Sequence, residues 1–176
     1  EGDLWSYSPG NGKVNQVFSF RKTEDGDFRD SRIQHDIKIV RVTDAGDIDF
    51  VLYGYMNRGS HEGYEGIGVY HYNPDKNVAE ERAFIPVSES FEFLKKDLEK
   101  LSYVNEENEL FLLLAKSLYK INIEDNSSEV LEEGIKNANF VSSDNNDHAA
   151  WLVSEGDEKG NIKEINFDTG ETRLIE

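Results

Sequence analysis

Short runs of alternating apolar and polar residues, joined by turn-forming residues, recur along the chain. The clearest pair is NIKEINFDTGETRLI at 161–175, and similar hairpins begin at Ser117, Gly68 and Asp3. Alternation with a period of two is typical of half-buried β-strands, and Pro, Gly, Asn and Asp between the runs are typical of tight turns. The pattern therefore predicts four β-hairpins of one design.

These hairpins recur at a spacing that suits a repeat fold. Aligned on the residue before each turn, the copies lie 65, 49 and 44 residues apart, at Tyr7, Tyr72, Ile121 and Ile165. A four-stranded propeller blade takes ~40–50 residues. We therefore expect an all-β fold of propeller-type, four-stranded antiparallel blades, about three and a half in this chain. The alternative is an open multi-sheet β fold.

The predicted units follow one another within a single domain, 1–176, or within part of a larger propeller. They are a hairpin at 3–20, a helix at about 88–100, and blades at 37–86, 101–133 and 137–175. The short amphipathic helix is predicted from apolar residues that share one face: Phe91, Leu94, Leu98 and Leu101. The run Ile48–Met56 is almost continuously apolar, which is typical of a strand buried on both faces.

Two segments interrupt the hairpins, a polar excursion at 21–36 and a glycine-rich insertion at Gly54–Gly68. We expect the glycines to make the insertion mobile or tightly turned. Long loops on a rigid sheet carry function more often than the sheet does. The predicted ligand-binding residues therefore lie in this insertion: Tyr55, Arg58, His61, Glu62, Tyr64 and Glu65. A tolerated surface insertion is the alternative.

In the last unit, a strand ending in Ser-x-Asp precedes a turn and an Ala-rich second strand, FVSSDNNDHAAWLV, followed by IKEINFDTGETRLI. In this order it resembles the blades of bacterial β-propellers of the WD40-like or TolB-like kind. The resemblance implies a fold and no particular activity. Closed propellers have roughly four to eight blades. We therefore expect a missing chain segment or a second copy of the chain to complete the half-blade.

The formal net charge is −17, from 36 acidic and 19 basic residues. The electrostatic field of so negative a protein repels phosphate backbones and anionic lipid headgroups. We therefore expect no nucleic-acid partner and no direct membrane insertion. The charge also has an ordinary explanation, because it keeps a β-rich surface soluble. Since the chain begins at Glu1 without an initiator Met, we expect a piece trimmed from a longer parent, and we favour a secreted or lipid-anchored parent.

No residue pattern predicts catalysis, a metal or a cofactor. HEGYE at 61–65 is not HExxH, the four histidines are scattered, and the chain has no cysteine. The acidic turns at Asp44–Asp47 and Asp144–His148 lack the EF-hand pattern. We assign Tyr53, Tyr70 and Tyr72 to core packing. The leading hypothesis is a non-enzymatic binding or interaction module that takes a protein, small-molecule or glycan ligand. The alternative is a segment of a propeller hydrolase that acts on glycans or peptides.

Overall fold

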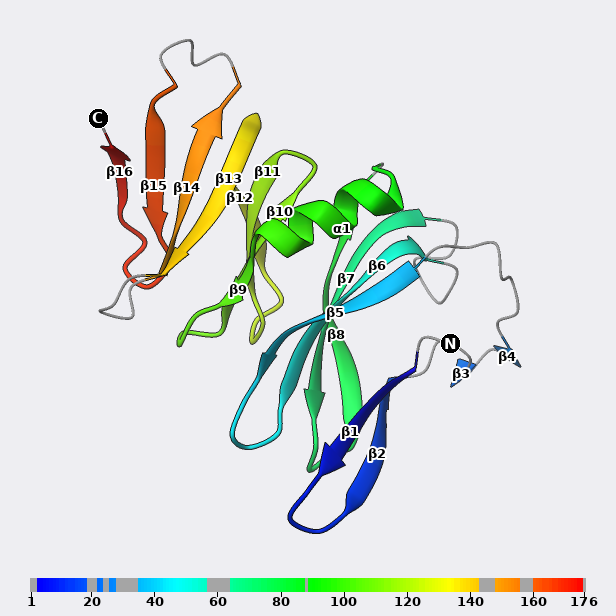
Figure 1. The fold of residues 1–176 in the computed structure, drawn as a ribbon. Coiled ribbons are helices and arrows are strands. Elements are labelled where there is room, and N and C mark those ends of the chain that lie inside the picture. The colour runs from blue at the N-terminus through cyan, green and yellow to red at the C-terminus, as the bar shows by residue number, and fades with distance from the viewer. Residues whose placement is uncertain are drawn as a thin grey trace. The chain divides into compact units, whose positions relative to one another are not determined.

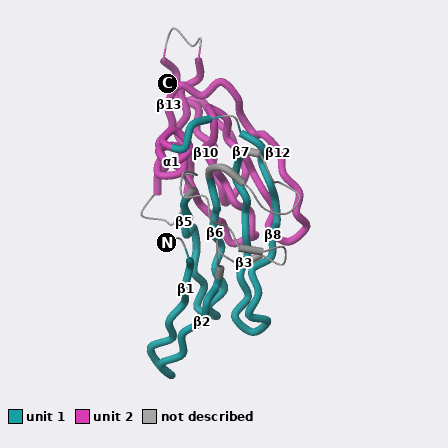
Figure 2. Tube along the Cα trace, turned by 90° about the vertical axis from the view of Figure 1, so that its right-hand side faces the viewer, with its two compact units in different colours: residues 1–91 teal, residues 92–176 magenta. Residues whose placement is uncertain are grey.

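The structure is a computed structural model and describes residues 3–18, 22–23, 26–27, 35–56, 64–87, 89–142, 148–155 and 160–175. Within these ranges the fold is all-β with a single α-helix. The chain divides into two compact units, unit 1 at Glu1–Phe91 and unit 2 at Glu92–Glu176 (Figure 2). The all-β prediction and the predicted antiparallel sheets are confirmed.

The described residues of unit 1 form one hairpin, one short ladder and one four-stranded antiparallel sheet (Figure 1). The hairpin is β1 (Leu4–Ser8) with β2 (Lys13–Phe18), and the ladder is β3 (Lys22–Thr23) with β4 (Gly26–Asp27). The sheet has the order β5 (His35–Val42), β6 (Ile48–Met56), β7 (Tyr64–Asn73) and β8 (Val78–Pro86). Each strand therefore pairs with the next strand along the chain.

The hairpin packs on one face of this sheet. Leu4 and Val17 of the hairpin contact a cluster that contains Phe50 and Tyr72. On β6, Phe50 and Val51 point to opposite faces and both are 0% exposed, so the prediction of a strand buried on both faces is confirmed. Tyr72 is also 0% exposed and Tyr53 only 4% exposed, which confirms their predicted place in the core.

Unit 2 contains two four-stranded antiparallel sheets, again in chain order. The first is β9 (Ser102–Val104), β10 (Glu109–Leu114), β11 (Ser117–Asn122) and β12 (Ser128–Glu132). The second is β13 (Ile135–Ser142), β14 (His148–Ser154), β15 (Ile162–Asn166) and β16 (Thr172–Ile175). The helix α1 (Phe91–Lys100) precedes them, and its Leu94 and Leu98 are 1% exposed, as the predicted apolar face requires.

One apolar core joins the two sheets of unit 2. Its members alternate along their strands, so that one face of each sheet faces the other sheet. The buried core residues are Leu101, Phe111, Leu113, Leu118, Ile135, Ala138, Ala150, Leu152, Ile165 and Phe167. Asp97 links the helix to the same unit, because its carboxylate accepts a hydrogen bond from the Ala115 amide at 3.1 Å.

The four predicted hairpins close with similar five-residue turns. Their fifth residues have positive φ values of 67°, 53°, 63° and 72°, at Gly12, Asn77, Asn126 and Gly170. In three of them the first residue is an asparagine whose side-chain oxygen accepts turn amides at 2.9 to 3.2 Å, at Asn73, Asn122 and Asn166. These asparagines stabilise the turn locally, as Asx-turns do.

The predicted bounds of the glycine-rich insertion are wrong. Strand β6 continues to Met56 and β7 begins at Tyr64, so only residues 57–63 of the insertion lie outside the described strands. Gly66 and Gly68 belong to β7. A Cβ atom on Gly66 would lie 2.5 Å from the Ile85 carbonyl oxygen, and one on Gly68 would lie 2.8 Å from the Tyr70 ring. Close packing, not mobility, explains these two glycines.

One strand boundary has no signal in the sequence. The run from Glu109 to Ile123 contains no glycine or proline, yet Ala115 and Lys116 form a two-residue turn with φ values of 49° and 65°. Leu114 pairs directly with Ser117 across this turn. Turns of this kind match the twist of the flanking strands even though non-glycine residues rarely take positive φ.

We predict that Gly66→Ala lowers the free energy of unfolding by about 1–3 kcal/mol, because the new methyl group overpacks the sheet. The matched control is Gly10→Ala, since nothing lies within 4 Å of a Cβ at Gly10. Urea unfolding monitored by circular dichroism measures both variants. Equal unfolding midpoints for the two variants would show that the strand backbone is not crowded at Gly66.

Candidate functional site

The loop residues predicted to bind a ligand are only partly described. Arg58, His61 and Glu62 lie outside the described residues. Tyr55, Tyr64 and Glu65 have described backbones, and Tyr55 pairs with Glu65 where β6 and β7 meet the insertion. Among the described residues, the candidate site is a pocket in unit 2.

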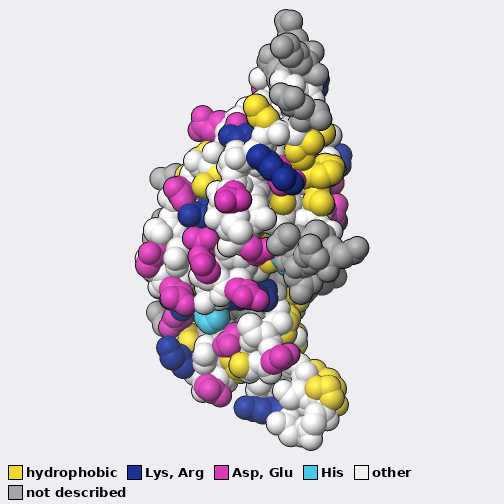
Figure 3. Space-filling view, turned by 90° about the vertical axis from the view of Figure 1, so that its left-hand side faces the viewer, with side chains coloured by type: hydrophobic (Ala, Val, Ile, Leu, Met, Phe, Trp, Pro, Cys, Tyr) yellow, Lys and Arg dark blue, Asp and Glu magenta, His cyan; other side chains and the backbone are white. Residues whose placement is uncertain are grey.

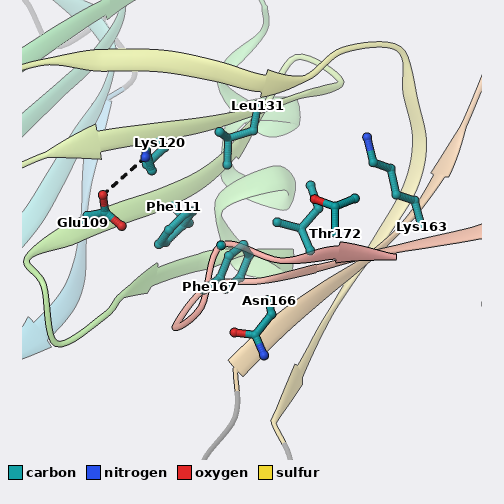
Figure 4. A pocket seen from close by; sticks show the side chains of 10 residues that line it. Glu109, Phe111, Lys120, Leu131, Lys163, Asn166, Phe167 and Thr172 are labelled. Atoms are coloured by element: carbon teal, nitrogen blue, oxygen red, sulfur yellow. Dashed lines mark ion pairs between the residues drawn. The ribbon is translucent and has the colours of Figure 1, made fainter. Parts of the chain in front are cut away.

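A pocket of about 160 Å³ lies between the two sheets of unit 2 (Figure 4). It is lined from β10, β11 and β12 on one side and from β15, its following turn and β16 on the other. The lining residues are Glu109, Phe111, Lys120, Leu131, Lys163, Ile165, Asn166, Phe167, Gly170 and Thr172. The pocket thus lies where the shared apolar core meets the polar edge of the sheets.

Aromatic rings form the apolar side of the pocket. Phe111 and Phe167 stack with ring centroids 4.2 Å apart and planes 22° apart. Phe167 is fixed from both sides of its backbone: its amide donates to the His148 carbonyl at 2.7 Å, and its carbonyl accepts from the Asn105 side chain at 2.9 Å. Asn105 is itself 3% exposed. These hydrogen bonds hold the backbone of Phe167 in place at the pocket wall.

Charged side chains of both signs surround the opening. The Lys120 ammonium lies 2.7 Å from Glu129 and 3.3 Å from Glu109 (Figure 4 shows the second pair). The hydrogen bond to Glu129, followed by that to Glu109, raises the pKa of Lys120 even though burial lowers it. Lys163 forms an ion pair with Glu132. The rim therefore offers paired donors and acceptors and no isolated charge.

The turn that carries Phe167 also contacts His148, the first residue of β14. His148 Nδ1 lies 2.9 Å from the Tyr103 hydroxyl and 3.2 Å from Asp168 Oδ2. The His148 amide donates to the same carboxylate oxygen at 2.8 Å. The imidazole stacks on the Tyr103 ring with centroids 4.5 Å apart, and Phe140 stacks beside it. These contacts orient the imidazole and tie the turn to β9 and β14.

Unit 1 contains a second polar cluster, along one row of its sheet. Asp49 is 0% exposed and pairs across the strands with Arg41 and His71. Arg41 Nε donates to Asp49 Oδ2 at 2.7 Å, and His71 Nδ1 lies 2.7 Å from Oδ1. Each oxygen of this buried carboxylate thus has a hydrogen-bonding partner, as buried polar groups require. We assign this cluster to the structure of the sheet.

A third polar row crosses the sheet β13–β16, on the face away from the shared core. Trp151, Glu164 and Arg173 are direct cross-strand neighbours. The Arg173 Nε and the Trp151 indole each donate to Glu164 at 2.6 Å. The hydrogen bond from Arg173, and then that from Trp151, lowers the pKa of Glu164. This face therefore has one neutralised ion pair beside a tryptophan that is 37% exposed.

Sequence reasoning missed most of these groups. It treated His71 and His148 as scattered residues, but their partners are neighbours only once strands are paired. A signal for Asp49 does exist, since an acid inside the apolar run Ile48–Met56 needs a partner in the adjacent strands. His148 and Asp168 are separated by strands β14 and β15, and no local pattern relates them.

The described residues contain neither a membrane-spanning helix nor a cluster of metal-binding side chains. In the described ranges, no helix is long and apolar enough to cross a membrane. Among the same residues, no group of three or more His, Asp or Glu side chains is placed to hold a metal ion. No protein-family model matches the chain, and no curated protein matches it.

We predict a fluorescence transition of Trp151 at a pH below 4.5, the ordinary pKa of a glutamate. A carboxyl whose pKa is lowered on folding stabilises the fold above its unfolded pKa, and this contribution is lost as the pH falls through the folded pKa. The Trp5→Phe background isolates the Trp151 signal, because the chain has two tryptophans.

Glu164→Gln in this background is expected to remove the transition. Far-UV circular dichroism at each pH separates it from acid unfolding of the whole protein. A midpoint above pH 4.5 in the folded protein would contradict the assignment.

Proposed function

We propose that this protein is a non-enzymatic binding module built from propeller-type blades, and that the pocket of unit 2 holds one ring of a small-molecule or glycan ligand. The observation that supports this proposal is the size of the pocket together with its lining. A dry cavity of about 150 Å³ lined by apolar side chains accommodates a benzene ring. The pocket, at about 160 Å³, is therefore large enough for a single six-membered ring.

The lining also favours a ring with polar substituents over a purely apolar one. Phe111 and Phe167 stack on each other and are almost fully buried, so they form an apolar wall beside which a sugar or an aromatic ring can lie. Lys120, Asn166 and Thr172 place donors and acceptors near the edge of such a ring. Few, well-placed polar groups around an apolar surface are typical of small-molecule sites.

Propeller-type blades are the interpretation of the sheets that we favour. All three four-stranded sheets are antiparallel and follow the chain order, and the sheets of unit 2 pack face to face. The four hairpins also share their turn geometry. A propeller is built from repeated four-stranded sheets of this order. The net charge of −17 supports a neutral or cationic ligand over nucleic acid or an anionic membrane.

A segment of a propeller hydrolase is the second candidate, and the His148 cluster is the observation that favours it. An imidazole held by a carboxylate through one nitrogen is the arrangement of an oriented general base. Here the Tyr103 hydroxyl contacts that same nitrogen, Nδ1, at 2.9 Å. The contacts therefore explain the position of the ring without requiring chemistry, and we rank this candidate below binding.

The pocket is tested with a panel of hexoses, N-acetylhexosamines and small aromatic alcohols and amines, using NMR shifts of the protein amides. We predict that binding perturbs β10, β11, β15 and β16, and that Thr172→Tyr weakens it about tenfold or more by filling the opening. Thr169→Tyr is the control, because Thr169 lies in the same turn region and does not line the pocket.

Shifts that are absent from these strands, or that survive Thr172→Tyr unchanged, would contradict the proposed site. Hydrolysis of a glycan or peptide in the panel would favour the second candidate instead, provided that His148→Asn abolishes it.

A further inference from the structure

The hairpin β1–β2 exposes an apolar face. Trp5 is 55% exposed, Tyr7 is 64% exposed and Val14 is 58% exposed. Tyr7 pairs directly with Val14, and Trp5 lies two residues earlier on the same strand, so all three share one face of the hairpin. Leu4 and Val17, on the other face, pack against the sheet of unit 1. The hairpin is therefore buried on one face only.

The residue before the turn in each of the other hairpins shows what kind of surface covers an apolar hairpin face. Tyr7 precedes the turn of its hairpin, as Tyr72, Ile121 and Ile165 precede theirs, and those three residues are 0%, 0% and 5% exposed. Tyr72 packs against the hairpin β1–β2, and Ile165 packs against the sheet β9–β12. In both cases the residue before the turn lies against the face of another β-sheet of this chain.

Unit 2 has a partly exposed sheet face on which such a hairpin face could pack. On β13–β16, the face opposite the shared core carries the cross-strand row Asn139, Trp151, Glu164 and Arg173. Trp151 is 37% exposed, and the Arg173 side chain is 72% exposed. Ala149 and Val153 flank Trp151 on this face of β14. Ala149 is itself only 7% exposed, so the indole of Trp151 and the half-buried Val153 give the surface that an aromatic hairpin can pack on.

Charge also favours contact between these two faces. The only charged residue within β1 and β2 is Lys13, which pairs with Ser8 and lies on the face opposite Tyr7. On the sheet β13–β16, Glu164 and Arg173 neutralise each other at 2.6 Å. Figure 3 shows acidic and basic side chains spread over one side of this strongly acidic molecule. Contact between the hairpin face and the row that contains Trp151 therefore places no charge against Glu164 and Arg173, which already compensate each other.

We propose that the apolar face of the hairpin β1–β2 docks on the Trp151 face of the sheet β13–β16 in a second copy of the chain. The two surfaces differ, so the contact is heterologous and joins copies head to tail. Buried tryptophan and tyrosine side chains supply most of the binding energy in such interfaces. The contact is independent of the pocket, which lies on the opposite face of β15 and β16.

Sedimentation velocity of the full chain tests this docking over about 1 to 100 µM, the range in which one interface of moderate affinity is half occupied. We expect the mass of the wild-type protein to rise with concentration. Tyr7→Glu and Trp151→Glu should each weaken association about tenfold or more, since each buries an unpaired charge in the contact. Phe93→Glu is the matched control, because Phe93 is an exposed aromatic residue on α1, at 60% exposed.

Mixing the two variants gives the most specific result. Trp151→Glu retains an intact hairpin and Tyr7→Glu retains an intact sheet face, so an equal mixture should form a dimer about tenfold or more tightly than either variant associates alone. Val14→Glu and Arg173→Glu replace the first pair if circular dichroism shows that either of those variants is misfolded.

A wild-type protein that stays monomeric throughout the range would overturn the proposal and would assign the hairpin face to a different partner. Association that survives both substitutions, or a mixture that stays monomeric, would overturn it equally.

Discussion

Face-to-face burial between β-sheets is the interaction on which this structure depends. In unit 2, alternate side chains of β10 and β11 meet those of β14 and β15, and the stacked rings of Phe111 and Phe167 are central to that contact. Unit 1 uses the same principle, with the hairpin β1–β2 on its sheet. Each four-stranded sheet has an apolar face that must be buried, so each sheet requires a neighbour.

This constraint also positions the candidate site. The turn after β15 begins at Asn166, whose side chain accepts the amides of Asp168 and Thr169 at 2.9 Å. The turn directs Phe167 into the pocket and Asp168 toward His148. The site is therefore formed by the ends of two packed sheets, and its residues come from elements whose positions are set by the core.

Much of the fold could be predicted from the sequence, because alternation and turn residues are local signals. The hairpins, the helix with Leu94 and Leu98, and the buried strand β6 all follow from such signals. The site could not be predicted, because its members meet only through strand pairing and sheet packing, as Tyr103 and His148 do. The reason for a glycine could not be predicted either. Gly66 lies in a crowded strand, but a glycine in a flexible loop looks the same in the sequence.

A double-mutant cycle at Phe111 and Phe167 tests the sheet-to-sheet contact most directly. Phe111→Leu, Phe167→Leu and the double variant are compared with the wild type by urea unfolding. We predict that the two substitutions are coupled by about 0.5–1.5 kcal/mol, as expected for a stacked aromatic pair. Strictly additive losses of the free energy of unfolding would show that the two sheets of unit 2 do not pack through these rings.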